Sequence, residues 1–299
     1  MKNINSFSIG LGTAQIGNTK NICDVVYNSI KSGIRIIDTA EVYGSEEGVG
    51  LGVKKAIEEG IVKREDLFII TKCYPYSRND PEKAIKRSLK NLKLDYIDLY
   101  LDHWPAFLQI NEKGENYKLI PLHIFWQKFE SLIEKKYTKF IGVSNYNVQS
   151  LINLLSFCKI KPFANEVEFH PYLYQKNLLS FCEKENIKVI AYNPLCKGNY
   201  DYHSGKEKLN LDLLNEPIIK ELSNKYKKSP GQIVLNWEIN KKVIPIPATS
   251  KTTRMKENLG AIEFTMEESD INKISELNKN YRFSSSICWS VIGKYDIFA

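Results

Sequence analysis

The stretch that decides the fold is residues 67–103, with the sequence LFIITKCYPYSRNDPEKAIKRSLKNLKLDYIDLYLDH. Two short apolar runs, LFIITK (67–72) and YIDLYLDH (96–103), flank PEKAIKRSLKNL, whose apolar residues recur at helical spacing. A strand, a helix and a second strand in this order form one βαβ unit, in which the two strands are parallel. The spacing from Lys72 to His103 matches one such unit.

Runs of the same kind recur along the chain and alternate with helix-like stretches. Near-continuous apolar strands between helices are typical of a parallel sheet that is buried on both faces. Eight units in 299 residues predict an α/β fold, a (β/α)8 TIM barrel formed as a single domain over residues 1–299. The predicted strands are 6–13, 34–39, 67–72, 96–103, 139–145, 164–169, 188–193 and 243–248.

A doubly wound sheet is the competing architecture, and it would need a glycine-rich turn after the first strand. The nearest stretch, GVGLGV (48–53), follows the second strand and has Val53 at the place of the third glycine. We interpret it as small residues entering a helix, without a role in phosphate binding. A further helix is expected over 147–158, with Asn147 as its N-cap.

Two long loops, at about 106–121 and 196–215, follow predicted strands and are expected on the C-terminal face of the barrel. Long loops on this face usually shape a ligand site, so they are expected to select the substrate. A third long segment, the tail loop at about 280–299, is expected either to pack against the barrel through its apolar residues or to close over the substrate.

Composition narrows the class of protein. The formal net charge is +7, which we interpret as a lysine-rich solvated surface rather than a phosphate-attracting one, and no basic–aromatic interleaving indicates nucleic acid. No apolar run is long enough to span a membrane, and the N-terminus lacks the apolar segment of a secretory signal. Six scattered cysteines are expected to be reduced thiols of a cytoplasmic protein. The four histidines show no metal-binding spacing, so no metal is expected, and a monomer is favoured.

Four ionisable residues, Asp38, Tyr43, Lys72 and His103, stand at or just beyond the ends of neighbouring predicted strands. In a parallel barrel these strand ends share one mouth. An ammonium lowers the pKa of an adjacent phenol, and a carboxylate holds the ammonium charged and in place. With a neutral imidazole that donates to a carbonyl oxygen, the set predicts a proton donor for a developing alkoxide, and hydride must come from a cofactor. Alone, Asp38 and Lys72 are equally consistent with a structural ion pair.

Five motifs, in order along nearly the whole chain, resemble the aldo-keto reductase family: GIRIIDTAEVYGSEE, LYLDHWP, KFIGVSN, NEVEFHPYL and VIPIPATSKTTRMKEN. The resemblance implies a barrel that binds extended NADPH across its mouth, with NADH as the alternative cofactor. It also implies that Tyr43 is the general acid, that Lys72 lowers its pKa, that Asp38 supports Lys72, and that His103 orients the substrate carbonyl.

The resemblance further implies the ligand contacts. Ser144 and Asn145 match the pair that hydrogen-bonds the nicotinamide carboxamide, and Tyr192 matches the ring that stacks on the nicotinamide. Arg254 matches an arginine near the 2′-phosphate, and Asn258 matches an adenine contact. The implied cofactor-binding set is Gly12, Thr13, Asp38, Ser144, Asn145, Glu166, Tyr192, Pro194, Leu195, Thr249, Ser250, Lys251, Arg254 and Asn258, and the substrate-binding set is Tyr43, His103 and Trp104.

Three positions depart from the family pattern. Glu166 stands where the family usually has glutamine, and a carboxylate accepts hydrogen bonds but cannot donate one. Ala248 replaces a common lysine before the arginine, so one cationic contact to the 2′-phosphate is lost unless Lys251 replaces it. Ala14 stands at a position often held by tryptophan, which opens the pocket wall.

The sequence therefore predicts an NADP(H)-dependent oxidoreductase that reduces aldehydes or reactive ketones, aldoses included, with Tyr43 as general acid. One alternative is an NADPH-binding regulatory or structural barrel with little turnover. Another is a barrel enzyme of other chemistry, such as a sugar isomerase, which would usually need a phosphate or metal site.

Overall fold

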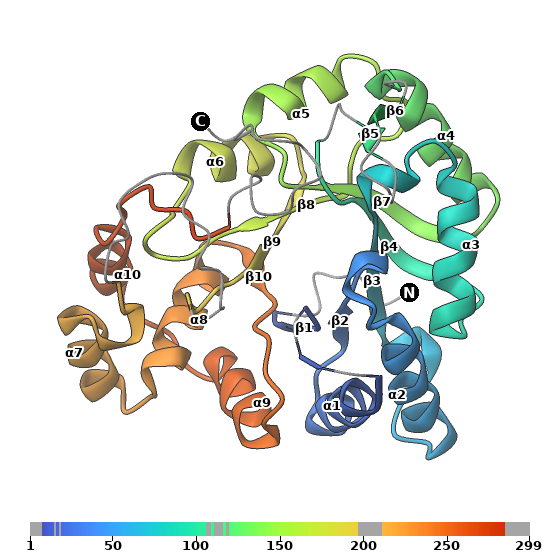
Figure 1. Cartoon of the computed structure of the whole chain (residues 1–299). Helices are drawn as coiled ribbons and strands as arrows, with labels where there is room; N and C mark the ends of the chain where they lie inside the picture. The colour runs from blue at the N-terminus through green and yellow to red at the C-terminus, as the bar shows by residue number, and fades with distance from the viewer. Residues whose placement is uncertain are drawn as a thin grey trace.

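Eight parallel strands form one sheet in the order β1-β2-β3-β4-β7-β8-β9-β10 (Figure 1). The computed structural model describes residues 8–14, 16–17, 19–105, 109–110, 116–117, 120–196 and 211–284. All eight predicted strands are present. They are β1 (Gly10–Gly12), β2 (Ile36–Asp38), β3 (Phe68–Cys73), β4 (Ile97–Asp102), β7 (Thr138–Ser144), β8 (Ala164–Glu168), β9 (Lys188–Tyr192) and β10 (Val243–Pro245). β1 begins at Gly10, inside the predicted range 6–13, and β10 ends at Pro245, three residues before the predicted end at 248, while the bounds of the other six strands agree within two residues.

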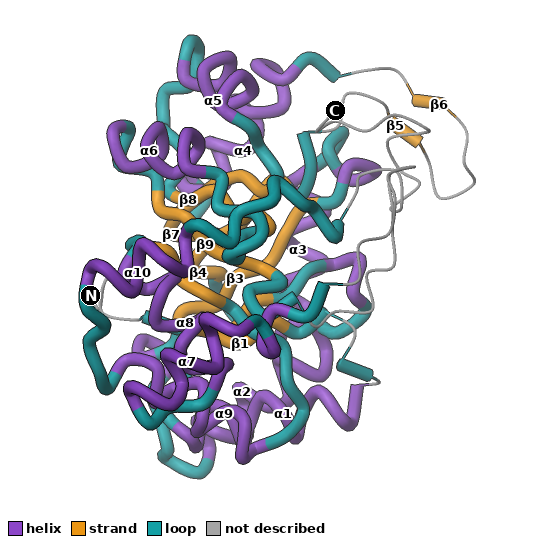
Figure 2. The backbone as a smooth tube through the Cα atoms, turned by 90° about the vertical axis from the view of Figure 1, so that its left-hand side faces the viewer, coloured by secondary structure: helices purple, strands orange, loops and turns teal. Residues whose placement is uncertain are grey.

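The sheet curves until its two edges meet. The Gly12 N–H donates to the Pro247 carbonyl oxygen at 3.4 Å, which joins the β1 edge to the segment that follows β10. The result is a nearly closed barrel with strands inside and helices outside, as the side view in Figure 2 shows. The predicted (β/α)8 architecture is confirmed.

The helices surround the strands and cover their outer faces (Figures 1 and 2). They are α1 (Thr19–Ser32), α2 (Glu46–Glu58), α3 (Pro81–Leu92), α4 (Leu122–Glu134), α5 (Val148–Leu155), α6 (Lys176–Lys184), α7 (Pro217–Tyr226), α8 (Pro230–Asn240), α9 (Thr252–Leu259) and α10 (Glu268–Ser275). Short 3-10 turns complete the described chain: η2 (Glu41–Tyr43), η3 (Arg64–Asp66), η4 (Pro75–Ser77), η5 (Leu213–Asn215) and η6 (Gly260–Ile262).

Side chains alternate between two apolar layers along each strand, because successive residues of a strand point to opposite faces. The inner layer fills the barrel, and the outer layer packs beneath the helices. Inner residues include Ile36, Phe68, Ile70, Leu99, Leu101, Ala164, Ile190 and Ile244, and outer residues include Leu11, Ile37, Ile69, Tyr100, Ile141 and Val189.

Two local predictions of helix structure have clear outcomes. The GVGLGV stretch lies within α2, as predicted. A Cβ atom added to Gly50 would stand 2.3 Å from the Leu92 carbonyl oxygen, and one added to Gly52 would stand 2.6 Å from the Cys23 carbonyl oxygen. These glycines therefore let α2 pass close to its neighbours. Asn147 is confirmed as the N-cap of α5, since its side chain accepts from the Ser150 N–H, but the helix ends at Leu155 rather than 158.

The three long segments are only partly described. Within 106–121 the chain forms a short antiparallel pair, β5 (Gln109–Ile110) with β6 (Asn116–Tyr117). Within 196–215, η5 follows at Leu213–Asn215, and residues 197–210 lie outside the described part. The described tail ends at Ser284, so the predicted loop over 285–299 is outside it as well.

None of the described helices is both long enough and apolar enough to cross a bilayer. Cys23, Cys73, Cys158 and Cys182 are free thiols, and Cys73 packs in the outer apolar layer, as strand alternation predicts.

Closure of the barrel makes a prediction about Gly12. An added Cβ would stand 2.8 Å from the Ile246 carbonyl oxygen, which is backbone and cannot move aside cheaply. We expect Gly12→Ala to lower the free energy of unfolding by about 1–3 kcal/mol, as overpacking does. The matched control is Gly231→Ala in α8, where the nearest atoms would be 3.9 and 4.0 Å away. Urea unfolding of both variants tests this, and equal stabilities would contradict it.

Candidate active site

On the inward face of several strands, the last side chain is polar and lies at one mouth of the barrel. Because residues two apart share a face, each polar side chain follows a row of inward apolar residues on its own strand. The series are Ile36–Asp38 on β2, Phe68–Ile70–Lys72 on β3, Leu99–Leu101–His103 at the end of β4, Ala164–Glu166 on β8 and Ile190–Tyr192 on β9.

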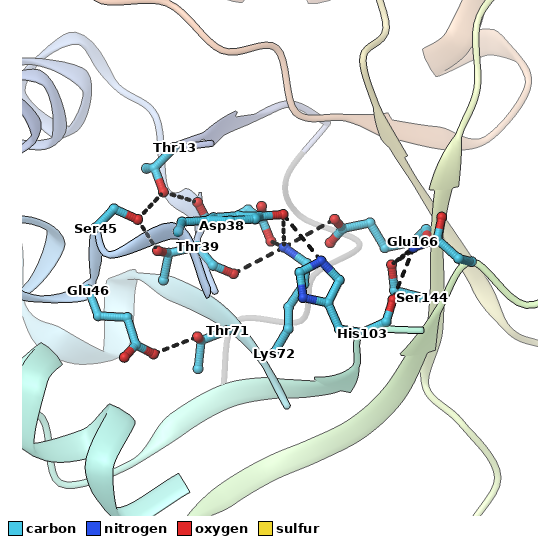
Figure 3. A network of polar contacts seen from close by, with 12 residues as sticks. Thr13, Asp38, Thr39, Ser45, Glu46, Thr71, Lys72, His103, Ser144 and Glu166 are labelled. Atoms are coloured by element: carbon cyan, nitrogen blue, oxygen red, sulfur yellow. Dashed lines mark hydrogen bonds and ion pairs between the residues drawn. The ribbon is translucent and has the colours of Figure 1, made fainter. Parts of the chain in front are cut away.

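Lys72 lies at the centre of this mouth and is fully buried. Its Nζ atom donates to Asp38 Oδ2 at 2.5 Å and to the Thr39 carbonyl oxygen at 3.0 Å (Figure 3). The Tyr43 hydroxyl is 3.5 Å from the same nitrogen, and Glu166 Oε1 is 3.2 Å from it. The structure thus brings together the predicted acid, amine and phenol, and adds a second carboxyl group from across the barrel.

The charge state of Lys72 follows from these contacts. Burial alone would lower its pKa, but the carboxyl groups of Asp38 and Glu166 outweigh burial and raise it. Burial raises the pKa of Asp38, an effect that the adjacent Lys72 ammonium partly reverses. Lys72 is therefore a permanent cation beside the Tyr43 hydroxyl.

Tyr43 ends the η2 turn and is half-buried, so its hydroxyl lies at the boundary between the cluster and the open mouth. The turn is held to β2 by a hydrogen bond of 2.7 Å between Thr39 Oγ1 and Ser45 Oγ. Thr13 Oγ1 is 3.2 Å from the Ser45 hydroxyl and donates to the Asp38 carbonyl oxygen. Thr13 therefore contacts the site only indirectly, by holding the backbone of Asp38 at the end of β2.

His103 directs Nε2 at the Tyr43 hydroxyl, 3.5 Å away. The two rings meet edge-on with their centroids 5.6 Å apart. Burial, and secondarily the Lys72 charge, lowers the pKa of His103 well below its ordinary value. The imidazole is therefore neutral at physiological pH and can donate from one nitrogen.

A second set of polar groups continues the mouth along β7, β8 and β9. Asn145 has φ 65°, a left-handed conformation that asparagine tolerates better than most residues. Its Nδ2 donates to the His103 carbonyl oxygen at 3.0 Å and to Ser144 Oγ at 3.1 Å, and its Oδ1 accepts from the Tyr192 hydroxyl at 2.8 Å. These contacts tie the second set to His103.

A cavity of about 880 Å³ opens from this mouth. Tyr43 and His103 line its inner part, and the exposed residues Lys251 and Arg254 line it at α9. Of the predicted ligand contacts, all but Thr13 line it: Gly12, Asp38, Tyr43, His103, Trp104, Ser144, Asn145, Glu166, Tyr192, Pro194, Leu195, Thr249, Ser250, Lys251, Arg254 and Asn258. Lys72 lies beneath the cavity and not in its wall.

The cavity fits a dinucleotide. It combines a partly exposed aromatic ring at Tyr192, amide and hydroxyl groups beside it, and two cations at the α9 end, where phosphates would be neutralised. No cluster of three His, Cys, Asp or Glu residues with metal-binding geometry is present among the described residues.

Sequence reasoning missed the N-terminus of α8. Ser229, Pro230 and Gly231 line the cavity, and Ser229 forms a capping box with Gln232. The S-P-G-Q signature predicts such a helix start, but nothing in it indicates that the helix begins at the ligand cavity. Leu214 and Asn215 of η5 also line the cavity, and they belong to the loop at about 196–215 that the sequence predicts beside the ligand site.

Glu168 was also missed, and it holds the start of the tail. Its two carboxylate oxygens accept from the backbone N–H groups of Phe283 at 3.0 Å and Ser284 at 2.9 Å. Burial would raise the pKa of Glu168, but the hydrogen bond from His170 and the charges nearby lower it. Because Ser284 lines the cavity, Glu168 fixes one part of the cavity wall.

Comparison with known proteins agrees with this geometry. The family model described as the Aldo/keto reductase family matches residues 8–279. Aldose reductase C of Dictyostelium discoideum is 37% identical, covering 94% of this chain and 88% of that protein. An NAD(P)H-dependent D-xylose reductase of Pyricularia oryzae is 35% identical, covering 97% and 95%. The crystal structure of a Bombyx mori aldo-keto reductase in complex with NADP matches with a TM-score of 0.86 at 33% identity, covering 97% and 94%.

This chain belongs to the aldo/keto reductase family, and the resemblance seen in its motifs is confirmed.

The burial of His103 makes a prediction about its titration. Because burial and Lys72 both disfavour the imidazolium, the His103 imidazole should stay neutral through the pH range in which a free histidine, with a pKa of about 6.5, gains its proton. Long-range ¹H–¹⁵N NMR spectra, assigned by comparison with His103→Gln, would show one neutral tautomer throughout. An ordinary titration midpoint for His103 would contradict this prediction.

Proposed function

We propose that this chain reduces aldehydes or reactive ketones to alcohols with NADPH as hydride source, and that Tyr43 is the proton donor. The observation that most supports this proposal is that the Tyr43 hydroxyl lies 3.5 Å from both Lys72 Nζ and His103 Nε2, at the edge of a cavity suited to a dinucleotide. Family membership supports the reaction class, an NAD(P)H-dependent oxidoreductase.

Tyr43 would transfer its hydroxyl proton to the carbonyl oxygen as negative charge develops there. The buried ammonium of Lys72 would stabilise the phenolate that is left behind, because an opposite charge at this distance acts strongly in a dry site. Asp38 would keep Lys72 charged and fixed in place. Together these groups would supply one proton at the wall of the cavity.

His103 would orient the substrate. A neutral imidazole donates a hydrogen bond to the carbonyl oxygen without protonating it, and Nε2 is the nitrogen that faces Tyr43. Trp104 follows directly and lines the cavity with its buried ring. Ala14 also lines the cavity and leaves more room there than a large aromatic would.

When bound, NADPH supplies a hydride from its nicotinamide ring to the carbonyl carbon. We propose that Ser144, Asn145 and Glu166 hold the carboxamide and that the Tyr192 ring stacks on the nicotinamide, a placement supported by their shared cavity wall. Gly12, Pro194 and Leu195 would complete the wall around the ring, and Thr13 would steady it by holding β2.

At the α9 end of the cavity, Arg254 and Lys251 would neutralise the 2′-phosphate of NADPH, and Asn258 would contact the adenine. Thr249 and Ser250 offer further hydroxyl and backbone donors there. Ala248 carries no charge, so Lys251 is proposed as the replacement cation. The preference for NADPH would then rest on two side chains, and NADH remains a usable cofactor.

The substrate is proposed to be a small carbonyl compound, with aldoses in their open-chain form as one class. We also propose a single domain over residues 1–299 with substrate loops at about 106–121, 196–215 and 280–299. A monomeric, cytoplasmic protein that binds neither nucleic acid nor membrane stays a prediction from the sequence.

The alternative, a regulatory or structural barrel that binds NADPH with little turnover, requires the same cavity but no proton donor. The assembled contacts among Asp38, Lys72, Tyr43 and His103 favour the enzyme, because a binding protein has no need of a buried cation beside a phenol.

Removal of the Tyr43 hydroxyl tests the assignment. Tyr43→Phe should lower kcat for a small aldehyde by about 10²–10⁴-fold, the contribution typical of general acid catalysis. NADPH affinity, measured by fluorescence titration, should stay close to wild type. The matched control is Tyr74→Phe, which removes a phenol hydroxyl whose ring lies 5.4 Å from that of His103 and should keep most of the turnover. Aldehyde reduction by Tyr43→Phe at the wild-type rate would contradict the assignment of Tyr43 as the proton donor.

Removal of Arg254 tests the cofactor end. Arg254→Ala should raise KM for NADPH by about 10–100-fold, as expected for loss of a hydrogen bond to a charged group, and should leave KM for NADH nearly unchanged. Lys256→Ala removes a charge from the exposed face of the same helix, away from the cavity, and should change neither value. Equal effects of Arg254→Ala on both cofactors would show that Arg254 does not contact the 2′-phosphate.

A further inference from the structure

The cluster around Lys72 contains more acid than base. Asp38 Oδ2 is 2.5 Å from Lys72 Nζ, and Glu166 Oε1 is 3.2 Å from it (Figure 3). The side chain of Asp38 is 3% exposed, that of Glu166 is 2% exposed, and that of Lys72 is 0% exposed. With both carboxyls ionised the buried cluster would carry one net negative charge. An uncompensated buried charge is costly, and a group in this position takes up a proton instead.

Other charged or titratable groups around the cluster do not balance this charge. His103 is neutral because burial lowers its pKa, and the Tyr192 hydroxyl donates to Asn145. Tyr43 is a phenol. Glu168, two residues along β8, is held by its own donors from His170 and the tail. Lys72 is therefore the one cation for two carboxyl groups among the described residues that meet here.

The contacts indicate which carboxyl group takes the proton. Asp38 has the shorter contact to the ammonium, which favours its ionised form. Glu166 has the longer contact, and its Oε2 is buried without a hydrogen-bond partner. Burial, and then the charge of Asp38, raises the pKa of Glu166 well above its ordinary value. Two carboxyl groups that share one site behave in this way, with the proton on the less stabilised member.

We propose that Glu166 is a neutral carboxylic acid at neutral pH, hydrogen-bonded within the Asp38–Lys72 cluster, and that this proton keeps the Lys72 charge available to Tyr43. A neutral acid both donates and accepts a hydrogen bond, as a side-chain amide does and a carboxylate does not, so it can take the place of glutamine at this position. Ionised Glu166 would place a second negative charge beside Lys72 and weaken its stabilisation of the Tyr43 phenolate. This consequence rests on the proposed function, whereas the protonation itself does not.

Infrared difference spectroscopy on the unliganded protein tests the protonation directly. The wild-type minus Glu166→Gln spectrum at neutral pH should contain the C=O stretch of a protonated carboxylic acid, shifted in D₂O. The matched control is Glu168→Gln, a glutamate buried on the same strand whose pKa is lowered, so its difference spectrum should contain carboxylate bands. Carboxylate bands for Glu166 at neutral pH would overturn the proposal, and this readout needs no bound cofactor and no activity.

The pH dependence of turnover tests the consequence. The ratio of kcat/KM for wild type to that for Glu166→Gln should fall as pH rises through the Glu166 ionisation, approaching about ten-fold per pH unit. The ratio cancels titrations that both proteins share, including that of the cofactor phosphate. If the acid band vanishes with rising pH while the ratio stays flat, the coupling to Tyr43 is overturned. Failure of the proposed function is distinguishable, because it would appear as unimpaired turnover in Tyr43→Phe with the infrared result unaffected.

Discussion

The site depends on one buried cation. Lys72 lies at the carboxyl end of β3, where its ammonium contacts Asp38 from β2 and Glu166 from β8 and faces the Tyr43 hydroxyl. Neither the ammonium nor an ionised carboxylate would be stable in this apolar interior alone, and the pairing of Lys72 with Asp38 lets the barrel carry these charges above its core. The low exposure that makes the cluster costly also strengthens its effect on the phenol.

Much of the fold could be predicted because the inward and outward residues of each strand alternate in the sequence. In LFIITK and IRIIDT the inward positions are apolar until the last one, which is Lys72 or Asp38, and this pattern predicts both a buried strand and a polar mouth. Cys73 is the complementary case, since its outward position and packing follow from the same period of two. The five motifs then identified the family, and the cavity contains nearly all of the ligand contacts that they imply.

The remaining features depend on contacts between distant segments, which no local pattern contains. Glu166 was noticed as a departure from the family, but its approach to Lys72 joins β8 to β3 across the barrel and depends on closure of the sheet. Glu168 holds the backbone of Phe283 and Ser284, more than a hundred residues further along the chain. Ser229 could be identified as a helix cap from sequence, but not as part of a cavity wall.

The measurement that tests the central claim most directly is a spectrophotometric screen of NADPH oxidation by the purified protein over a panel of carbonyl compounds, repeated with NADH. The panel should contain short aldehydes, open-chain aldoses, dicarbonyls and quinones. The account predicts that at least one aldehyde class is reduced, with NADPH used more efficiently than NADH. Saturable NADPH binding without oxidation of the cofactor by any member of the panel would contradict it and would favour a binding protein built on the same barrel.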